Sequence, residues 1–545
     1  MIQKIRRLLK EKQWGGLVVA RTDSFLGEYY PPEKDVLHGL TGFSGSAGVA
    51  VITQAEKILF VDSRYTEQAK IESDFMVLEV PTQTTPTDWI KQNLSHSVVG
   101  YNPWQRSTLW VNYVEQKGIK TAAIDRPVWQ SLFPSEEMPP EDIFDYDVGY
   151  CGETTTDKVK RVCRRLKELN LDAYVLTVPD SVSWLLNKRS PAVPQYPVIF
   201  KRWVVHADGQ HHELSDTMSE LTGKKVGLDL ALTPMAVFQK IQTMATVVNL
   251  PDPVEQMKAI KNPVEQNNIR QACLFESAVL CRFLTWVEQN KNQIDELDCD
   301  KKLRLLRSES PLYRGDSFDT IAAVGEHAAC AHYLATKESN KPVISAPMLL
   351  VDTGGNYLNG TTDMTRTICV GQPTDLMKKR YTQVLKGHIA LAMTPVKQGD
   401  LPIALDKNAR SFLRADGVDY GHSTGHGIGM YLAVHEAPPV IYEKSDTPLM
   451  PGMLFSNEPA YYDSENGFGI RLENMILTVA GPEDSLILEN LLWVPFDGRL
   501  IDFADLTDSE REWLRSYHQG IQDRIMPKLS STEQAVLEPL LDFFR

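Results

Sequence analysis

The chain has 545 residues, more than one hydrophobic core usually organises, so two to four domains are expected. Its 42% hydrophobic and 23% charged residues are typical of a folded protein and exclude a disordered or fibrous one. The formal net charge is -14, and the sequence has no long run of basic residues, only short clusters such as Arg6-Arg7, which argues against nucleic-acid binding.

The cysteines and the N-terminus indicate the cellular compartment. The seven cysteines are odd in number and form no Cys-x-x-Cys motif, which predicts reduced, mostly buried thiols rather than a disulfide framework. The first residues, MIQKIRRLLKEKQW, are basic and amphipathic but lack the apolar segment of a signal peptide, and a transit peptide is the less favoured alternative. No apolar run approaches the ~20 residues that span a bilayer. We therefore expect a cytoplasmic protein with no membrane partner.

Two segments of the first half resemble each other. Residues 4–24 and 161–181 both read as an amphipathic helix, a short aliphatic strand and a polar Asp-Ser turn. Aligning the two segments superposes Ile5 on Val162 and Leu9 on Leu166. Each segment opens a longer stretch with further strand-like runs, such as VAVITQAEKILFVDS and PVIFKRWVVHADG. We predict two related α/β domains, at residues 1–150 and 155–250.

A proline-punctuated segment, residues 250–270, predicts a linker. Within it, Asn262-Pro263 is a favourable helix start, and the apolar periodicity that follows predicts a long helix to about Gln293. This helix opens the predicted third domain.

The rest of the chain changes character twice. Beyond Ser317 it consists of short strand-like runs, glycine turns and histidines, and from about Asp505 it reads as helical again. We predict one α+β domain over residues 255–545, with a C-terminal helical extension, which makes the whole chain a combination of α/β and α+β domains.

Acids and histidines occur in unusual surroundings in this third domain. Asp352 ends an apolar run that is expected to be a buried strand, Asp363 is expected within the next strand after an Asn-Gly turn that favours a hairpin, and Glu458 follows another apolar run. The segments are APMLLVDTGG with Asp352, NGTTDMTRTICV with Asp363, GHSTGHGIG with His422 and His426, MLFSNEPAYY with Glu458, and FGIRLENMILTV with Arg471 and Glu473 on one face of an expected strand.

Carboxylates inside apolar runs are costly unless something neutralises them. Each of them alone has a structural interpretation, because a buried Asp can cap a turn and a buried Glu can pair with an arginine. Four carboxylates and one imidazole in one domain favour a metal site for Mn²⁺, Co²⁺, Fe²⁺ or Zn²⁺ instead. Because carboxylates can bridge, five side chains suffice for two metals, which would lower the pKa of a bridging water and supply hydroxide at neutral pH. The sequence therefore predicts a two-metal hydrolase.

Three competing motifs are disfavoured. GHSTG fits the Gly-x-Ser-x-Gly elbow of serine hydrolases around Ser423, but no helix pattern follows it. His422 and His426 have the spacing of helical zinc ligands, but the surrounding glycines argue against a helix. GFSGSAG at 42–48 lacks the Lys-Ser/Thr of a phosphate loop, so a packing role is the preferred interpretation.

The motifs VDTGGNYLNGTTDMTRT, HSTGHGIGMYLAVHE, NEPAYY and GIRLEN together resemble those of the pita-bread metallopeptidases of peptidase family M24. With TGFSGSAG, LFVDSRYTEQA and MKAIKNPVEQNNIR, the chain is similar over nearly its whole length to the long, three-domain form of Xaa-Pro aminopeptidase (aminopeptidase P). The resemblance implies two creatinase-like N-terminal domains followed by a pita-bread catalytic domain. Asn359, where relatives often carry Asp, lies outside the expected metal ligands.

The resemblance also implies how the metals are held. Asp352 would bind one metal, Asp363 and Glu473 would bridge both, and His426 and Glu458 would complete the other. Glu458 would also be the general base. The expected cofactor is a pair of divalent ions, Mn²⁺ in first place with Zn²⁺ or Co²⁺ as alternatives.

Four further residues match catalytic or substrate-binding positions of the family. His332, His422 and His435 would contact the substrate, with His332 and His435 also assisting catalysis. Arg471 would lie beside the final metal ligand and act with the catalytic group. Each histidine alone is also compatible with a hydrogen-bonded structural imidazole.

The implied reaction is hydrolysis of the N-terminal Xaa-Pro bond of peptides, so the expected partners are peptides with proline at the second position. An Xaa-Pro bond has no N–H that a general peptidase could grip. A prolidase restricted to dipeptides and a non-catalytic pita-bread binding module stay open as alternatives, and the metal-free creatinases are disfavoured because all five ligands are present. We also predict a homodimer, with Trp513 and Phe543-Phe544 packing on the third domain or on a second subunit.

Overall fold

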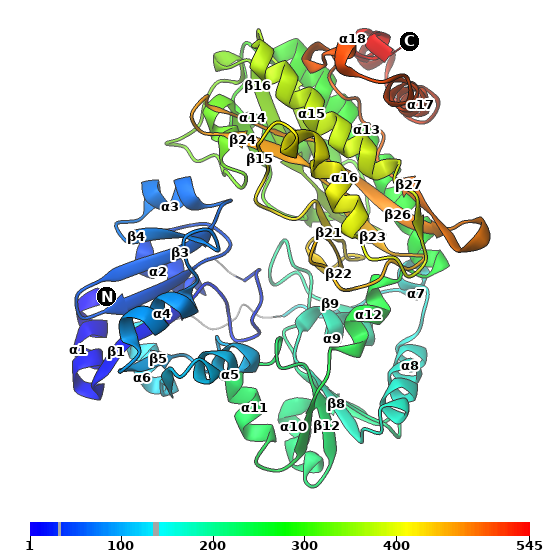
Figure 1. The fold of residues 1–545 in the computed structure, drawn as a ribbon. Coiled ribbons are helices and arrows are strands. Elements are labelled where there is room, and N and C mark those ends of the chain that lie inside the picture. Colours follow the sequence, from blue (N-terminus) through cyan, green and yellow to red (C-terminus); the bar gives the residue numbers. More distant parts are fainter. Residues whose placement is uncertain (31–33, 135–140, 545) are drawn as a thin grey trace. The chain divides into compact units, whose positions relative to one another are not determined.

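The computed structural model describes residues 1–30, 34–134 and 141–544, drawn in Figure 1. The chain forms two compact units. Unit 1 comprises Met1–Val148 and Glu153–Gln256, and unit 2 comprises Gly149–Gly152 and Met257–Arg545. The three predicted domain ranges include residues 31–33, 135–140 and 545, which lie outside the described part, and their boundaries stay predictions.

The first half of unit 1 is built on a mixed sheet with strand order β4-β3-β2-β1-β5-β6. Its strands are β1 (Trp14–Ala20), β2 (Val49–Thr53), β3 (Lys57–Asp62), β4 (Met76–Val80), β5 (Val98–Tyr101) and β6 (Lys120–Ala123). Its helices are α1 (Ile2–Lys12), α2 (Val36–Thr41), α3 (Thr66–Glu72), α4 (Pro86–Leu94), α5 (Thr108–Gln116) and α6 (Arg126–Leu132).

The second half of unit 1 has a smaller sheet with strand order β11-β10-β8-β12-β13. Its strands are β8 (Ala173–Leu176), β10 (Trp203–His206), β11 (His211–Glu213), β12 (Lys225–Leu228) and β13 (Thr246–Asn249), and β7 (Phe144–Asp145) pairs with β9 (Lys188–Arg189) beside it. Its helices are α8 (Thr155–Glu168), α9 (Pro179–Leu186), α10 (Leu214–Thr217) and α11 (Met235–Ile241), while α7 (Val148–Cys151) and α12 (Pro253–Ala259) each belong partly to unit 1 and partly to unit 2.

The two sheets share one topology, which supports the internal repeat. β1 lies between an antiparallel β2 and a parallel β5, and β8 lies between an antiparallel β10 and a parallel β12. Each central strand follows a helix, α1 or α8, as the sequence predicts. The superposed pairs Ile5/Val162 and Leu9/Leu166 are all fully buried. The repeat therefore reflects the same amphipathic helix packing on the same kind of sheet.

Unit 2 opens with the predicted long helix. α13 (Pro263–Asn290) begins at Asn262, whose side chain caps the helix while Glu265 binds back to the Asn262 N–H, and proline occupies the first turn. The preceding segment is not a plain linker, because α12 occupies part of it. Pro253 is compatible with the first turn of a helix, because the N–H that it lacks would have no helical partner there. Its presence therefore does not exclude a helix.

The strands of unit 2 form several small sheets, with orders β14-β17-β18, β15-β16-β19, β24-β25 and β20-β27-β26-β23-β21-β22. They are β14 (Tyr313–Asp316), β15 (Ile321–Val324), β16 (Met348–Thr353), β17 (Gly355–Tyr357), β18 (Gly360–Thr361), β19 (Met364–Cys369), β20 (Val396–Lys397), β21 (Gly425–Gly427), β22 (Glu436–Ile441), β23 (Leu454–Asn457), β24 (Ala460–Asp463), β25 (Phe468–Arg471), β26 (Asn474–Ala480) and β27 (Ser485–Asn490).

Helices cover these sheets. They are α13, α14 (Glu296–Arg307), α15 (Asp375–Ala392), α16 (Ile403–Arg414), α17 (Asp508–Arg524) and α18 (Ser531–Leu541), and α15 packs along α16 (Figure 1). The predicted hairpin is present, because β17 pairs with β18 across Asn359. The predicted C-terminal helices are confirmed as α17 and α18. The core of unit 2 joins α13 and the strands to the apolar faces of both C-terminal helices.

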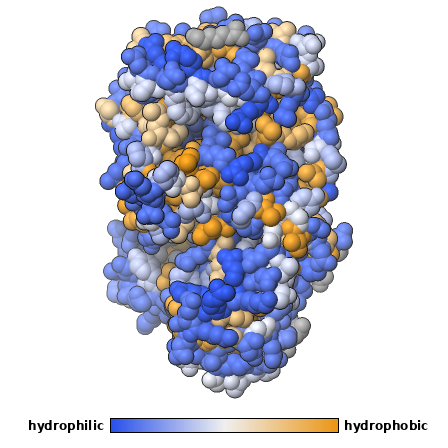
Figure 2. Space-filling view, turned by 90° about the vertical axis from the view of Figure 1, so that its right-hand side faces the viewer, coloured by the Kyte–Doolittle hydropathy of each residue, from blue (hydrophilic) through white to orange (hydrophobic). Residues whose placement is uncertain are grey.

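The surface and the thiols agree with the composition. Six of the seven cysteines are buried, Cys330 is partly exposed, and all are free, as predicted. The face drawn in Figure 2 is mostly hydrophilic, with apolar residues in small separate groups, which is normal for a folded surface. Among the described residues, no helix combines the length and apolar character needed to cross a membrane.

His518 of α17 gives the fold a pH dependence. Burial lowers the pKa of His518 to about 3, from an ordinary value of 6.5. The neutral ring uses both nitrogens, because Nδ1–H donates to the carbonyl of Leu514 at 2.7 Å and Nε2 accepts from the N–H of Phe496 at 3.3 Å. Between pH 6.5 and 3 the unfolded chain therefore binds a proton that the folded chain does not, so stability falls as the pH falls through this window.

We expect His518→Gln to weaken this dependence. The free energy of unfolding of the variant should change with pH less steeply than that of the wild type, by roughly 1.4 kcal/mol per pH unit between pH 6 and 4. The measurement is urea unfolding of both proteins across that range. His96→Gln, at an exposed position, is the control and should leave the slope unchanged; equal slopes for His518→Gln and wild type would contradict the prediction.

Candidate metal centre

The predicted metal ligands lie at strand ends in unit 2. Asp352 is near the end of β16, and His426 is the middle residue of β21. Glu458 directly follows β23. Asp363 directly precedes β19 and Glu473 directly precedes β26, so the expectation that these two lie within strands is wrong by one position.

The backbone changes its hydrogen-bond partners at both positions. The N–H of Asp363 donates to the Sδ of Met475 at 3.3 Å, and the N–H of Glu473 donates to the carbonyl of Thr365 at 3.1 Å. β25 pairs with β24 whereas β26 pairs with β23, so residues 472–473 are the step between two sheets. Such a step releases a side chain from the strict alternation of one strand and lets the two carboxylates face the same space.

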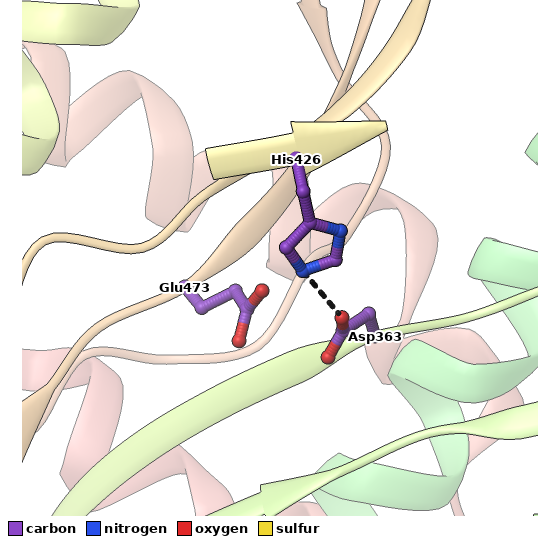
Figure 3. A group of neighbouring side chains, drawn as sticks. All are labelled: Asp363, His426 and Glu473. Atoms are coloured by element: carbon purple, nitrogen blue, oxygen red, sulfur yellow. Dashed lines mark ion pairs between the residues drawn. The ribbon is translucent and has the colours of Figure 1, made fainter. Parts of the chain in front are cut away.

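Three of the ligands form a tight group, shown in Figure 3. One potential ligand atom from each of Asp363, His426 and Glu473 lies within 4.8 Å of the other two. His426 Nε2 lies 3.4 Å from Asp363 Oδ2, and the carboxylate of Glu473 lies beside the same ring. The other ring nitrogen of His426, Nδ1, donates to the carbonyl of Gly427 at 2.9 Å, so Nε2 is the nitrogen left for a metal.

Glu458 and Asp352 extend this group on two sides. His426 Nε2 lies 3.4 Å from Glu458 Oε1, which also accepts from the hydroxyl of Ser456 at 3.2 Å. Asp352 Oδ2 accepts from Arg471 Nη2 at 2.5 Å. The structure thus brings all five predicted ligands into one connected, largely buried network.

The charges of the network are not balanced by the protein alone. Burial raises the pKa of Glu473 well above its ordinary value, and the charges of Asp363, Glu458 and Asp352 raise it further. Burial also raises the pKa of Asp352 and of Glu458, despite Arg471 beside the first and His426 beside the second. Burial would lower the pKa of His426, but the hydrogen bond to Asp363 and the charge of Glu458 raise it to about 9.

Two oxygens of this network lack a protein partner. Asp352 Oδ1 and Glu473 Oε1 are buried and accept no hydrogen bond within the described residues. A buried anionic oxygen without a partner is unfavourable, and a cation would satisfy both oxygens. Excess buried negative charge, an imidazole Nε2 that faces two carboxylates and unused carboxylate oxygens all fit divalent metal ions.

Arg471 connects Asp352 to His422. Arg471 Nη1 donates to the hydroxyl of Tyr462 at 2.7 Å, and that oxygen lies 3.0 Å from His422 Nε2. Because the guanidinium can only donate, the Tyr462 proton is available to His422 Nε2. His422 Nδ1 lies 2.7 Å from the carbonyl of Ser423 and donates to it, so both ring nitrogens of His422 have a partner.

The other two predicted histidines lie in different settings. The half-buried ring of His435 packs edge-on against the His426 ring, with centroids 4.5 Å apart and planes at 82°. His332 lies half-buried in a turn between β15 and β16. His435 thereby lies beside the predicted metal ligand His426, while the roles of His435 and His332 stay predictions.

Comparison with known protein families covers nearly the whole chain. Residues 267–480 match the metallopeptidase family M24, and residues 484–539 match the C-terminal region of peptidase M24. Residues 1–125 and 134–214 each match a creatinase/prolidase N-terminal domain. A probable Xaa-Pro aminopeptidase P of Laccaria bicolor is 31% identical over 98% of this chain and 91% of its own length. The chain belongs to the Xaa-Pro aminopeptidase P family.

Further relatives agree with this assignment to the Xaa-Pro aminopeptidase P family. The probable Xaa-Pro aminopeptidase P of Tuber melanosporum is 30% identical over 96% of this chain and 95% of its own. The crystal structure of an X-prolyl aminopeptidase from Caenorhabditis elegans, described as a cytosolic enzyme with a di-nuclear active site, has a TM-score of 0.92. That structure is 28% identical and covers 100% of this chain and 98% of its own. The predicted fold class, two creatinase-like domains before a catalytic M24 domain, is confirmed.

The sequence alone did not point to two side chains that contact the predicted site residues, Thr365 and Tyr462. The hydroxyl of Thr365 donates to Glu473 Oε2 at 2.7 Å and accepts from Arg471 Nε at 3.1 Å, so it links a predicted ligand to the arginine. Tyr462 links Arg471 to His422. The only signal was a polar residue within the buried strand β19 and a tyrosine repeated in NEPAYY, and neither is specific.

The disfavoured motifs also fail in the structure of this family member. The strand β21 begins at Gly425, the last residue of GHSTG, and no helix occurs between residues 421 and 430, so neither a nucleophile elbow at Ser423 nor helical zinc ligation is built. In GFSGSAG, a Cβ at Gly45 would lie 2.1 Å from the Phe43 ring and 2.7 Å from the Tyr65 ring. This supports the packing role predicted for that segment.

Proposed function

We propose that this chain is a metal-dependent aminopeptidase that hydrolyses the N-terminal Xaa-Pro bond of peptides. The observation that carries the proposal is the buried network of Asp352, Asp363, His426, Glu458 and Glu473, with two carboxylate oxygens that lack a protein partner. Membership in the Xaa-Pro aminopeptidase P family supports the substrate class.

The network has enough donors for two metal ions. Asp352 would hold one ion, Asp363 and Glu473 would bridge both, and His426 and Glu458 would hold the other. Mn²⁺ is the proposed metal, with Zn²⁺ or Co²⁺ as alternatives, because carboxylate-rich sites with one imidazole suit these ions. When bound, the pair supplies Lewis acidity and a nucleophilic hydroxide at neutral pH.

The chain's own groups handle the protons and the orientation of the substrate. Glu458 is the proposed base, because its carboxylate faces the proposed metal site, with Oε1 3.4 Å from His426 Nε2. The proton passes to the proline nitrogen, which leaves as a secondary amine. His435, beside His426, is positioned to donate to the developing oxyanion, and His332 and His422 are proposed to contact the substrate.

Arg471 has a supporting part in this proposal. It holds Asp352 through Nη2 and keeps Tyr462 oriented toward His422 through Nη1. Its guanidinium stays charged, because burial is outweighed by Tyr462 and the surrounding carboxylates, which raise its pKa well above the ordinary value. Arg471 therefore links the metal ligands to the proposed substrate histidines.

Proline selectivity is tested with three peptides. We expect Mn²⁺-loaded protein to release arginine from Arg-Pro-Pro and to cleave Arg-Ala-Ala at least about 100-fold more slowly, because relatives in the family are named for cleavage before proline and a metal site does not need a scissile N–H. The measurement is product release followed by chromatography. Equal rates on the two tripeptides would refute the selectivity, and cleavage of Ala-Pro alone would turn the assignment to a prolidase.

Cellular location and assembly complete the proposal. A cytoplasmic location is supported by the description of the Caenorhabditis elegans enzyme as cytosolic. The homodimer gains no support from the C-terminal aromatic residues, because Trp513 stacks on Tyr517 and Phe544 stacks on His518 within unit 2. Light scattering of the purified protein decides between monomer and dimer.

A further inference from the structure

Three charged side chains are buried together in unit 2, and one of them, Glu436, directly follows His435. Lys258, Lys261 and Glu436 are 4%, 1% and 3% exposed. Lys258 Nζ lies 3.1 Å from Glu436 Oε2, and Lys261 Nζ donates to Glu436 Oε1. Lys261 Nζ also donates to the carbonyl of Lys258 at 2.9 Å. We refer to these three residues as the Glu436 cluster.

Such a cluster contributes little to stability for its cost. Removing charges from water is unfavourable, and apolar residues of similar volume often stabilise a fold equally well or better than a buried ion pair. What an ion pair adds is one defined geometry, since each charged group must meet its partner. The place of Glu436 in the chain indicates what is being held in that geometry.

Strand pairing alone does not fix the segment that ends at Glu436. In the antiparallel ladder of β21 and β22, His426 pairs with Val440, but the next residue, Gly427, pairs with Glu436. Residues 437–439, Ala-Pro-Pro, are therefore looped out between the two pairs, and both prolines lack the N–H that a ladder bond needs. The position of residues 435–436 depends on contacts other than a regular ladder.

The lysine side of the cluster is itself firmly anchored. The N–H of Lys261 donates to the carbonyl of Gly452 at 2.8 Å, and Gln266 Nε2 donates to the carbonyl of Lys261 at 2.8 Å. Gln266 belongs to α13, and residues 260 and 453 form an isolated β-bridge beside it. The ammonium of Lys261 thus presents a fixed partner to Glu436.

His435 directly precedes Glu436 and packs its ring against the ring of His426. We propose that Glu436, held by Lys258 and Lys261, is a positioning residue that sets His435 against the metal ligand His426. The inference rests on the proposed function for its catalytic consequence, but the geometry it describes belongs to the fold. Misplacing a catalytic group by about 1 Å can lower a rate by about 100-fold.

The first test compares kinetics with stability. Glu436→Gln should lower kcat on Arg-Pro-Pro by about 10- to 100-fold, with KM changed less than about 3-fold, because a misplaced His435 affects the transition state more than substrate binding. The triple variant Lys258→Met, Lys261→Met and Glu436→Met should keep the wild-type melting temperature or exceed it, yet show the same loss of kcat. Wild-type kinetics in either variant would overturn the proposal.

A double-mutant cycle tests whether the effect passes through His435. If it does, Glu436→Gln should cause less than about a 2-fold further loss in a His435→Ala background. Full additivity of the two losses would overturn the proposal. The control is Glu489→Gln, which breaks the partly exposed ion pair with Arg270 elsewhere in unit 2 and should leave kcat unchanged.

Hydrogen–deuterium exchange provides a readout that needs no activity. Glu436→Gln should increase amide exchange in peptides that cover residues 428–436, with little change in peptides of β16 and β19. Unchanged exchange there would overturn the proposal even in a fully active enzyme. If the wild type cleaved no Xaa-Pro peptide while the exchange increased as expected, the proposed function would fail and the positioning of His435 would stand.

Discussion

Asp363→Asn is expected to lower the rate of Xaa-Pro hydrolysis by at least about 10³-fold, because it removes the charge of the carboxylate proposed to bridge both metals. Asparagine keeps the size of the side chain, and the backbone N–H of residue 363 can still donate to Met475 Sδ. The change between sheets before β19 should therefore persist. The loss should therefore appear with a folded protein. Activity on Arg-Pro-Pro and metal content by mass spectrometry are measured together.

The effect of the same variant on stability has a distinctive sign. Without metal, Asp363 repels Glu473 and Asp352, and both neighbours have raised pKa values in part for this reason. Removing its charge should leave the melting temperature of the chelated protein equal to or above that of wild type. Added Mn²⁺ should raise the melting temperature of the wild type and have little effect on the variant, since a ligand stabilises only the state that binds it.

Asp463→Asn is the matched control for this experiment. Asp463 ends β24 and binds Tyr461 and Asn466, outside the proposed ligand set. It should retain metal, the Mn²⁺-dependent rise in melting temperature, and activity. Full activity of the Asp363→Asn variant would show that Asp363 is not a metal ligand. If this variant does not fold, the same measurements are made on Glu473→Gln, for which full activity would likewise contradict the metal site.

The second large effect is expected on stability, from Arg307→Met. The side chains of Arg307 and Glu276 are 0% exposed and joined at 2.7 Å, and Arg307 also donates to Asp316 Oδ1 at 3.2 Å and to Thr353 Oγ1 at 2.8 Å. Removing the guanidinium leaves the carboxylate of Glu276 buried with only the Tyr357 hydroxyl as a partner among the bonds described. We expect a loss of about 3–5 kcal/mol in the stability of unit 2.

The measurement is urea unfolding monitored by tryptophan fluorescence, with the transitions of the two units analysed separately because a chain of this size need not unfold in one step. Arg307→Met combined with Glu276→Met should recover most of the loss, since no unpaired charge remains. Lys301→Met, at an exposed ion pair with Asp298 on the same helix, should change stability by less than about 1 kcal/mol. A loss of less than about 1 kcal/mol for Arg307→Met would contradict the expectation.

Local sequence patterns were sufficient to predict several helices and strands and the types of residue at the candidate metal centre. The Asn262-Pro263 pair with Glu265 specifies the start of α13 because a cap, a fixed proline φ and a capping glutamate all act within four residues. The repeat that superposes Leu9 on Leu166 was visible because an amphipathic helix has a regular spacing of apolar residues. Carboxylates within apolar runs pointed to a metal site because charge in such places needs a partner.

The sequence misplaced Asp363 and Glu473 within strands for a definite reason. Their neighbours are β-formers, but the backbone changes from one sheet to another at both residues, between β18 and β19 at Asp363 and between β25 and β26 at Glu473. Only the pairing of the strands decides where that change occurs. The linker predicted before α13 failed similarly. Pro253 begins a helix instead of excluding one, because the first turn of a helix does not need the missing N–H.

By itself, the sequence of this chain determined the repeated α/β architecture, the long helix of the third domain and the residue types of the metal centre, since these depend on near neighbours and periodicity. Only the tertiary structure decided which distant side chains hydrogen-bond to Glu473 and to Glu436. Thr365 reaches Glu473 across 108 residues of chain, and Lys261 reaches Glu436 across 175. Contacts over such separations depend on sheet pairing and packing, which no local pattern specifies.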